Sequence, residues 1–146
     1  MYKKILVPLD GSKAAECVLP HVSSLACGTP AEVLLVRTLE HPYYDYLLRD
    51  AELSVCQDDE HTQEAEEYLG RIAKPLAEGG LSVSTCVHAE HGAAADVIVG
   101  FARSSGADLI AISAHGGSAG MRRILGSVAD RIVHRSRIPV LLVHPP

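Results

Sequence analysis

Tryptophan is absent from this chain, and its 146 residues include only five tyrosines and one phenylalanine. Because 47% of the residues are nonetheless hydrophobic, the core must be built from valine, isoleucine, leucine and alanine. No Cys-x-x-Cys pair occurs, so we expect reduced, mostly buried thiols of a cytoplasmic protein. The length suits one domain, residues 1–146, with room for a sizeable core. The thiols are Cys17, Cys27, Cys56 and Cys86.

A basic surplus and long apolar runs are also missing. The formal net charge is −5, whereas a nucleic-acid surface would need a basic stripe. No apolar run approaches the roughly 18 residues of a membrane span. The opening residues, Met1 to Lys4, lead straight into an expected strand, without the apolar core and cleavage site of a signal peptide. These features predict a cytoplasmic location.

The common nucleotide signatures are missing as well. The chain has no Walker A sequence and no G-x-G-x-x-G. P-loop kinase and dinucleotide dehydrogenase functions therefore lack their sequence support. Internal repeats and low-complexity linkers are absent too.

Short apolar runs alternate along the chain with amphipathic segments. This alternation predicts an α/β fold, a parallel sheet with helices on both faces. Ligands of such sheets bind beyond the carboxyl ends of the strands, where the strand order reverses. The expected strands are Lys3–Leu9, Glu32–Thr38, Leu81–Val87, Ala107–Ile112 and Ile138–Val143, and the expected helices are Lys13–Ala26, Asp58–Glu78, Gly92–Arg103 and Ser127–Arg135.

The first helix carries three specific expectations. Ser12 suits its N-cap, because a serine hydroxyl accepts a backbone N–H there. Pro20 is expected to interrupt or kink the helix, because proline removes a helical hydrogen bond. Its buried stripe is expected to include Val18, Val22 and Leu25.

The stretch from Ala107 to Val128 combines a buried strand, a glycine-rich loop and a helix start. Gly116 and Gly126 have no Cβ and let the backbone approach an anion closely. A helix that begins at Ser127 adds the positive end of its dipole, about half a charge. Arg122 and Arg123 could add charge-assisted contacts to phosphate. A solvated loop with two surface arginines is the alternative on local chemistry alone.

The spacing in this stretch resembles the nucleotide motif of the universal stress protein family, Gly-x2-Gly-x9-Gly-Ser/Thr. Gly116, Gly126 and Ser127 match three of its four fixed positions, and Ser113 stands where the first glycine belongs. The resemblance extends over KKILVPLDGS at the start and over SGADLIAISAHG and LGSVADRIVHRSRIPVLLVHPP near the end. The segment from His41 to Glu60 matches nothing in particular.

This resemblance implies a five-stranded parallel sheet of order 3-2-1-4-5, an adenine nucleotide alpha hydrolase-like or Rossmann-like fold. In that order strands one and four are neighbours at the switch point, which brings Asp10 beside the loop from Ser113 to Gly116. The implied ligand is ATP, or AMP or ADP in its place, with Mg²⁺ carried on the phosphates. The implied binding residues are Pro8, Leu9, Asp10, Thr38, Ile112, Ser113, Gly116, Gly126, Ser127 and Val128.

Each implied residue has a role. Pro8, Leu9 and Asp10 match the segment on the adenosine side, and Asp10 could accept from a ribose hydroxyl or the adenine amino group, hold a metal ion, or simply cap the first helix. Thr38 matches a position whose backbone touches the base, and Ile112 would pack on the sugar or base. Gly116, Gly126, Ser127 and Val128 would supply phosphate N–H donors. His115 is expected to have a structural hydrogen-bonding role.

The resemblance also implies a stress-response regulator that forms a homodimer through its last strand, Pro139–Val143. An unpaired apolar edge strand is a pairing surface unless it is covered. No residue resembles a base poised at a γ-phosphate, so any ATP hydrolysis is expected to be slow. The alternative is a dimeric interaction module of the same fold that no longer binds nucleotide, which Ser113 in place of glycine favours.

Two other enzyme patterns fit poorly. Gly116 to Gly120 matches the nucleophile elbow G-x-S-x-G, but Ser118 is not at a sharp strand-to-helix turn. Asp130 and His134 lie one turn apart on one expected helix, in the wrong place to serve that serine. His88-Ala89-Glu90-His91 begins like a zinc deaminase signature but lacks the later P-C-x-x-C, and solvated strand-end residues fit better.

Tyrosines gather before and within the second expected helix. Tyr43, Tyr44 and Tyr46 lie in one loop, and Tyr68 follows nearby. Such a group could stack on a base or seal a partner surface, or it could cap the edge of the core.

Overall fold

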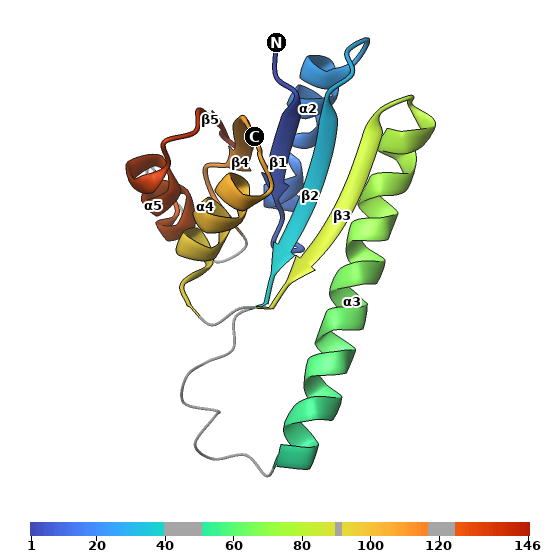
Figure 1. Ribbon diagram of the computed structural model, residues 1–146, viewed down its shortest axis with the longest axis vertical. Helices are drawn as coiled ribbons and strands as arrows, with labels where there is room; N and C mark the ends of the chain where they lie inside the picture. The colour runs from blue at the N-terminus through green and yellow to red at the C-terminus, as the bar shows by residue number, and fades with distance from the viewer. Residues whose placement is uncertain (40–50, 90–91, 117–124) are drawn as a thin grey trace.

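The structure, a computed structural model, describes residues 1–39, 51–89, 92–116 and 125–146, with the backbone alone for 51–59. All pairings in its five-stranded sheet are parallel, and the strand order is β3-β2-β1-β4-β5. This confirms the fold class and the strand order implied by the sequence (Figure 1). The strands are β1 (Lys4–Pro8), β2 (Glu32–Thr38), β3 (Ser82–His88), β4 (Leu109–Ser113) and β5 (Val140–Val143).

The central strand β1 is apolar because helices cover both of its faces. Ile5 and Val7 point into one layer of the core and Leu6 points into the other, and all three are fully buried. Successive side chains of a strand alternate between faces, so such a strand must be hydrophobic throughout. Fully burying one of these side chains contributes about 1.5–3 kcal/mol.

Helices lie on both faces of the sheet, as the alternating pattern predicts (Figure 1). Buried residues of α1, α2 and α3 share one layer of the core, and those of α4 and α5 share the other. None of the described helices is both long and apolar enough to cross a membrane. The helices are α1 (Lys13–Glu16), α2 (Leu19–Ala26), α3 (Ala51–Glu78), α4 (Ala94–Ser104) and α5 (Ser127–Arg135).

The first expected helix is two helices. Ser12 is the N-cap of α1, and its hydroxyl accepts from the Ala15 amide, as predicted. The expectation that Pro20 interrupts or kinks the helix is met by an interruption, because α1 ends at Glu16 and Pro20 lies in the first turn of α2. Proline is well tolerated there, since the first amides of a helix have no intrahelical acceptor.

Two further details differ from the sequence expectations. Leu25 is 42% exposed, so it is not part of the buried stripe. The helix α3 begins at Ala51, seven residues before the expected Asp58, and runs for 28 residues. In Figure 1 it extends well beyond the end of the sheet. Among the side chains of this helix that the structure describes, residues 60–78, the first buried one is Ala65.

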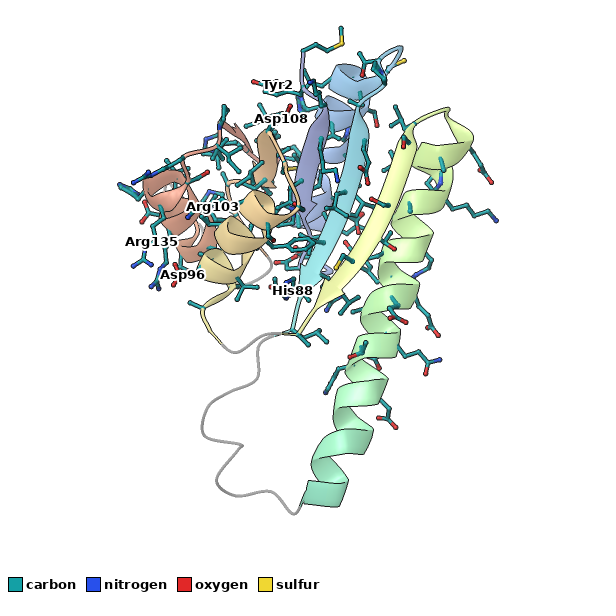
Figure 2. All side chains as sticks on the ribbon, viewed as in Figure 1. Tyr2, His88, Asp96, Arg103, Asp108 and Arg135 are labelled. Carbon is teal, nitrogen blue, oxygen red and sulfur yellow. The ribbon has the colours of Figure 1, made fainter. Side chains whose placement is uncertain are left out.

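Helices α4 and α5 are joined on their outer surface by one acidic residue. Asp96 accepts from Arg135 at 2.6 Å and pairs with Arg131 at 3.0 Å. Figure 2 shows Asp96 and Arg135 facing each other across the two helices. This tie supports the packing of α5, the helix whose first residues carry the implied nucleotide motif.

Candidate functional site

The carboxyl ends of β2, β1 and β4 lie side by side at one edge of the sheet. β1 pairs with β2 on one side and with β4 on the other, and Pro8 is opposite Val36 in the register. The Leu9 amide continues the pairing by donating to the Val36 carbonyl at 2.9 Å. We call the residues that follow these ends the strand-end site. It comprises Asp10, Thr38, Ser113–Gly116 and Gly126–Val128.

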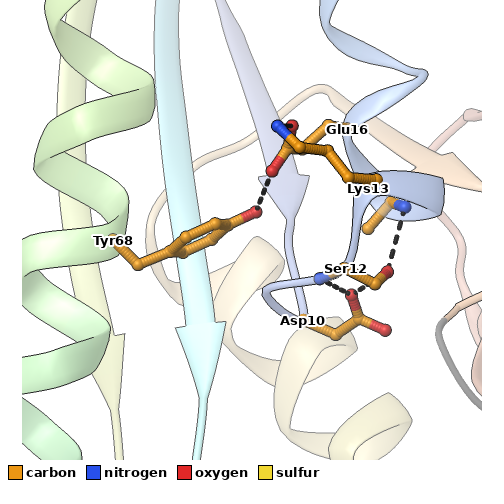
Figure 3. Close-up of polar contacts among 6 residues, drawn as sticks. Asp10, Ser12, Lys13, Glu16 and Tyr68 are labelled. Atoms are coloured by element: carbon orange, nitrogen blue, oxygen red, sulfur yellow. Dashed lines mark hydrogen bonds and ion pairs between the residues drawn. The ribbon is translucent and has the colours of Figure 1, made fainter.

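Asp10 joins the two halves of the strand-end site. One carboxylate oxygen, Oδ1, accepts from the Ser12 amide at 2.9 Å and from the Ser12 hydroxyl at 2.5 Å (Figure 3). The other, Oδ2, lies so close to Gly116 that a Cβ on that glycine would be 2.5 Å from it. The predicted meeting of Asp10 with the glycine loop is therefore confirmed. Asp10 also orders the turn before α1, although Ser12, not Asp10, caps the helix.

The loop after β4 and the start of α5 pack against each other through their backbones. The Ala114 amide donates to Val143 of β5 at 2.7 Å, and the Gly126 amide donates to the Ala114 carbonyl at 2.7 Å. A Cβ on Gly126 would lie 3.2 Å from that carbonyl oxygen and 3.6 Å from the Cα of His115. A side chain at Gly126 would therefore force the two segments apart.

Of two sequence expectations about the start of α5, one is confirmed and one needs correction. The helix begins at Ser127, as expected, and Gly126 occupies the N-cap position. The Gly126 amide is not available to a phosphate in this structure, because it is bonded to Ala114. The donors offered by a regular helix at this point are the amides of Ser127 and Val128, which have no intrahelical acceptor. The role of Gly126 is to allow the close approach.

Ser113 is buried, with 5% of its surface exposed. Its hydroxyl donates to the His115 carbonyl at 2.7 Å and accepts from the His115 amide at 3.3 Å. The Cys17 thiol lies 3.5 Å behind the hydroxyl as a third partner. Ser113 therefore holds the loop from within and does not point out toward a ligand.

The backbone of His115, rather than its ring, makes the hydrogen bonds that the structure shows for this residue. Its ring nitrogen Nδ1 is buried and has no hydrogen-bond partner within the described parts of the chain. The ring centroid lies 6.1 Å from that of His144. The expected structural role is thus met by the main chain.

The apolar residues of the implied site belong to the core. Leu9 is 4% exposed and packs in the layer of α1 to α3, and Ile112 is 7% exposed and packs in the layer of α4 and α5. Pro8 ends β1 and is buried, whereas Thr38 ends β2 and is half-buried. Thr38 shares the strand-end edge with Asp10.

Sequence reasoning missed a polar cleft beside Asp10. The cleft has a volume of about 350 Å³ and is lined by Asp10, Gly11, Arg37, Glu64, Glu67, Tyr68 and Arg71. The guanidinium of Arg37 lies 5.3 Å from the centre of the Tyr68 ring, and its Nη1 would be 2.7 Å from a Cβ on Gly11. Side chains alternate along a strand, which places Arg37 on the face of β2 that α3 covers. The signal available in the sequence was a single positive charge near the end of an apolar strand.

Tyr68 closes the inner wall of this cleft. Its hydroxyl donates to Oε1 of Glu16 at 3.2 Å (Figure 3). Burial, reinforced by the charge of Glu16 and the hydrogen bond to it, raises the pKa of Tyr68 far above its usual range. Tyr68 is therefore a proton donor at every physiological pH. Of the tyrosines grouped by the sequence analysis, it caps the core as the structural alternative predicts, while Tyr43, Tyr44 and Tyr46 lie outside the described residues.

The alternative enzyme patterns gain no support from the described residues. Within them, no group of three or more histidine, cysteine, aspartate and glutamate side chains could hold a metal ion. Glu90 and His91 of the deaminase-like pattern, Ser118 of the elbow pattern, and Arg122 and Arg123 lie outside the residues that the structure describes.

Comparison with known proteins finds relatives over the whole chain. The family model described as "Universal stress protein family" matches residues 1–144. Universal stress protein MJ0577 from Methanocaldococcus jannaschii is 30% identical over 156 residues, which cover 98% of this chain and 95% of the relative. A solved structure of hypothetical protein MJ0577, the subject of a structure-based assignment of biochemical function, aligns with a TM-score of 0.89 at 30% identity, over 100% of this chain and 98% of that one.

A further solved structure shares the fold at lower identity. It is the universal stress protein from Archaeoglobus fulgidus in complex with dAMP, with a TM-score of 0.68 and 23% identity over 97% of each chain. At this identity the likeness concerns the fold alone.

Proposed function

Because the chain belongs to the universal stress protein family, we propose that it binds an adenine nucleotide, with ATP as the first candidate, at the strand-end site. Binding would make it a stress-response regulator or sensor of the cytoplasm. The observation that carries the proposal is the contact between Asp10 and Gly116, where a Cβ would lie 2.5 Å from the carboxylate. This contact puts a carboxylate, which can accept a hydrogen bond from a hydroxyl group, directly beside a loop residue that has no side chain.

The phosphate end of the nucleotide would lie between the loop after β4 and the start of α5. Gly116 offers a backbone without a side chain, and Ser127 and Val128 offer the first amides of α5 at the positive end of its dipole. The Ser127 hydroxyl adds a further donor. Gly126 allows these two segments to meet, because its Cα faces the Ala114 carbonyl and the Cα of His115.

The adenosine end would lie toward β1 and β2. Asp10, whose carboxylate lies beside Gly116, would accept from a ribose hydroxyl or from the adenine amino group. The backbone of Thr38, at the end of β2, would face the base. Leu9 would lie on the adenosine side from the layer of α1 to α3, and Ile112 would pack on the sugar or base from the layer of α4 and α5. The A. fulgidus protein of the same fold is in complex with dAMP, so this fold can hold an adenine nucleotide.

Magnesium would be carried by the nucleotide rather than by the protein. The described residues form no group of three potential ligands, and Mg²⁺ on nucleotides usually takes one or two protein carboxylates at most. Asp10 is the acidic side chain at this edge that could contribute. With no base assigned at the γ-phosphate, hydrolysis would be slow, and the chain would act by binding.

A calorimetric titration tests this function directly. ATP and AMP are titrated with magnesium into wild type and into Gly126→Val. The valine would press on the Ala114 carbonyl, which lies 3.2 Å from the position of a Cβ. We expect saturable ATP binding by wild type and a loss of at least tenfold in affinity in the variant. Gly70→Val is the matched control, because nothing lies within 4 Å of a Cβ at Gly70 in α3 and valine is no worse than glycine in a helix.

The outcomes separate the two functions that the family allows. ATP binding that is kept in Gly70→Val and lost in Gly126→Val supports the nucleotide function. No heat with either nucleotide in wild type contradicts it, and favours a dimeric interaction module that has no ligand at this edge.

A further inference from the structure

Ser113 differs from the family motif, and its surroundings give it a defined task. The motif has glycine at this position, whereas here a hydroxyl is buried behind the loop, with 5% of the residue exposed. A serine hydroxyl has one proton to donate and two lone pairs that accept. The hydroxyl donates to the His115 carbonyl and accepts from the His115 amide, and the Cys17 thiol, which also lies 3.9 Å from the Val143 carbonyl, is a further donor at 3.5 Å.

The strongest of these bonds fixes the direction of one peptide group. The Ser113 hydroxyl lies 2.7 Å from the His115 carbonyl oxygen, the usual length for such a bond. In a trans peptide the carbonyl and the following N–H point in opposite directions, and the described chain contains no cis peptide. Because the His115 carbonyl turns inward, the Gly116 N–H turns outward.

The outward side of this peptide is where the proposed ligand would lie. The Gly116 nitrogen is 3.8 Å from the position of a Cβ on Gly126, and the Gly116 Cα faces Asp10. The Gly116 nitrogen therefore lies on the side of the loop that faces the start of α5. Without the Ser113 hydroxyl, the His115 carbonyl would lose the hydrogen bond that holds it inward, and the peptide group could rotate.

We propose that Ser113 is a positioning residue that aims the Gly116 amide at the phosphate of a bound nucleotide. The inference rests on the proposed function, since it assigns a task within that site. Cys17, on the turn between α1 and α2, supports the serine from behind at 3.5 Å. Ser113 thus acts through the Gly116 amide and need not touch the ligand.

The chain contains a matched control for this arrangement. Ser136 donates to the Ile138 carbonyl at 2.7 Å and accepts from the Ile138 amide at 3.0 Å. The pattern is the same as at Ser113, but Ser136 lies just after α5 and before β5, at the opposite edge of the sheet. Ser136→Ala removes an equivalent pair of local hydrogen bonds without touching the strand-end site.

The experiment compares ATP and adenosine binding in wild type, Ser113→Ala, Ser113→Thr and Ser136→Ala. We expect Ser113→Ala to weaken ATP binding about tenfold, the effect of losing one hydrogen bond to a charged group. Adenosine binding should stay unchanged, because adenosine has no phosphate. Ser113→Thr keeps the hydroxyl and should restore ATP binding, and Ser136→Ala should bind both ligands like wild type.

A spectroscopic measurement distinguishes a changed direction of the Gly116 amide from a general loss of stability. In wild type, ATP should shift the amide proton signal of Gly116 downfield together with those of Ser127 and Val128. In Ser113→Ala the signals of Ser127 and Val128 should still move, but that of Gly116 should not. Should Ser113→Ala fail to fold, the nearly isosteric Ser113→Cys, a weaker donor, supports the same comparison.

Different results overturn the two claims. If wild type binds ATP and Ser113→Ala binds it equally well, with the Gly116 signal moving as before, the positioning role is wrong while the site stands. If wild type binds no ATP, the proposed function is wrong and the positioning role fails with it.

Discussion

At the scale of single residues, the contact of Gly116 with Asp10 leads to a direct test. In Gly116→Ala the new methyl would lie 2.5 Å from Oδ2 of Asp10, so the carboxylate must move. Because Oδ1 also holds Ser12, the turn before α1 moves with it. We expect a loss of at least tenfold in ATP affinity and a decrease of about 1 kcal/mol in the free energy of unfolding. Calorimetry and urea denaturation measure the two effects.

The control for this substitution is Gly70→Ala. Nothing lies within 4 Å of a Cβ at that position on α3, and alanine in a helix is more stable than glycine by about 0.5–1 kcal/mol. The control should therefore gain stability and keep its ATP affinity. Equal ATP affinity in Gly116→Ala and wild type would show that the Asp10–Gly116 contact does not form part of a nucleotide site.

Contacts between residues could be predicted where the sheet topology fixes them. They could not be predicted where a group can bond to any of several nearby partners. Asp10 and Gly116 come from distant parts of the sequence, but the carboxyl ends of adjacent parallel strands must meet, so their contact could be predicted. The Gly126 amide was predicted to bind phosphate, yet it bonds to Ala114. Arg37 lies against Gly11 and Tyr68. Neither detail follows from a spacing, because each depends on which of several nearby partners a group selects.

At the scale of elements, Asp108 fixes the start of β4 to the start of β1. Its carboxylate accepts from the Lys3 amide at 2.8 Å and from the Lys4 amide at 3.0 Å, and its own amide donates to the Lys4 carbonyl at 3.0 Å. Figure 2 places Asp108 near the start of the sheet. Burial alone would raise the pKa of Asp108, but the hydrogen bonds from these amides outweigh it and lower the pKa.

The lowered pKa predicts how Asp108→Asn behaves with pH. An amide in place of the carboxylate sets one N–H against another, so Asp108→Asn should lose about 1 kcal/mol at pH 7. The folded pKa lies below the usual value of 3.8, so the contribution is present above 3.8 and is lost as the pH falls through the folded value. Urea denaturation should show that the difference in unfolding free energy between wild type and variant is smaller at pH 3 than at pH 7. A difference of the same size at both pH values would show that the charge of Asp108 does not cause it.

The boundaries of the helices could be predicted only in part from the periodicity of the sequence. Periodicity located every strand of the described sheet, since buried parallel strands are short apolar runs. It did not separate α1 from α2, because Pro20 fits either a kink or the first turn of a new helix. It also missed the early part of α3, from Ala51, since the sequence before Asp58 is only weakly amphipathic.

At the scale of the whole molecule, the sequence pattern predicts the kind of sheet, whereas the order of its strands comes from the family resemblance. The alternation of strands and helices predicts parallel pairing and coverage of both faces. It does not choose 3-2-1-4-5 among the possible orders, because the crossover rule fixes handedness and not which strands are neighbours. That order was implied by the family resemblance and is confirmed by the pairing of β1 with both β2 and β4.

This sheet order leaves β5 at one edge, and we propose that two copies of the chain pair there. All four residues from Val140 to Val143 are half-buried and apolar. The carbonyls of Pro139 and Val143 bond to β4, so by the alternation of a parallel ladder Val140 and Leu142 turn their N–H groups outward. An apolar edge with outward N–H groups favours a second strand. Sedimentation at micromolar concentration should therefore give twice the chain mass of 15.5 kDa.

Two substitutions at one position separate backbone pairing from side-chain packing. Leu142→Pro removes an outward N–H that β4 does not use, and proline is tolerated on edge strands. We expect it to sediment as a folded monomer, whereas Leu142→Ala, which trims the side chain but keeps the N–H, should dimerise at least ten times more tightly than the proline variant. Circular dichroism verifies that both are folded. If wild type is monomeric, or if folded Leu142→Pro remains as dimeric as Leu142→Ala, the chains do not pair through β5, and the strand-end site must then act within a single copy.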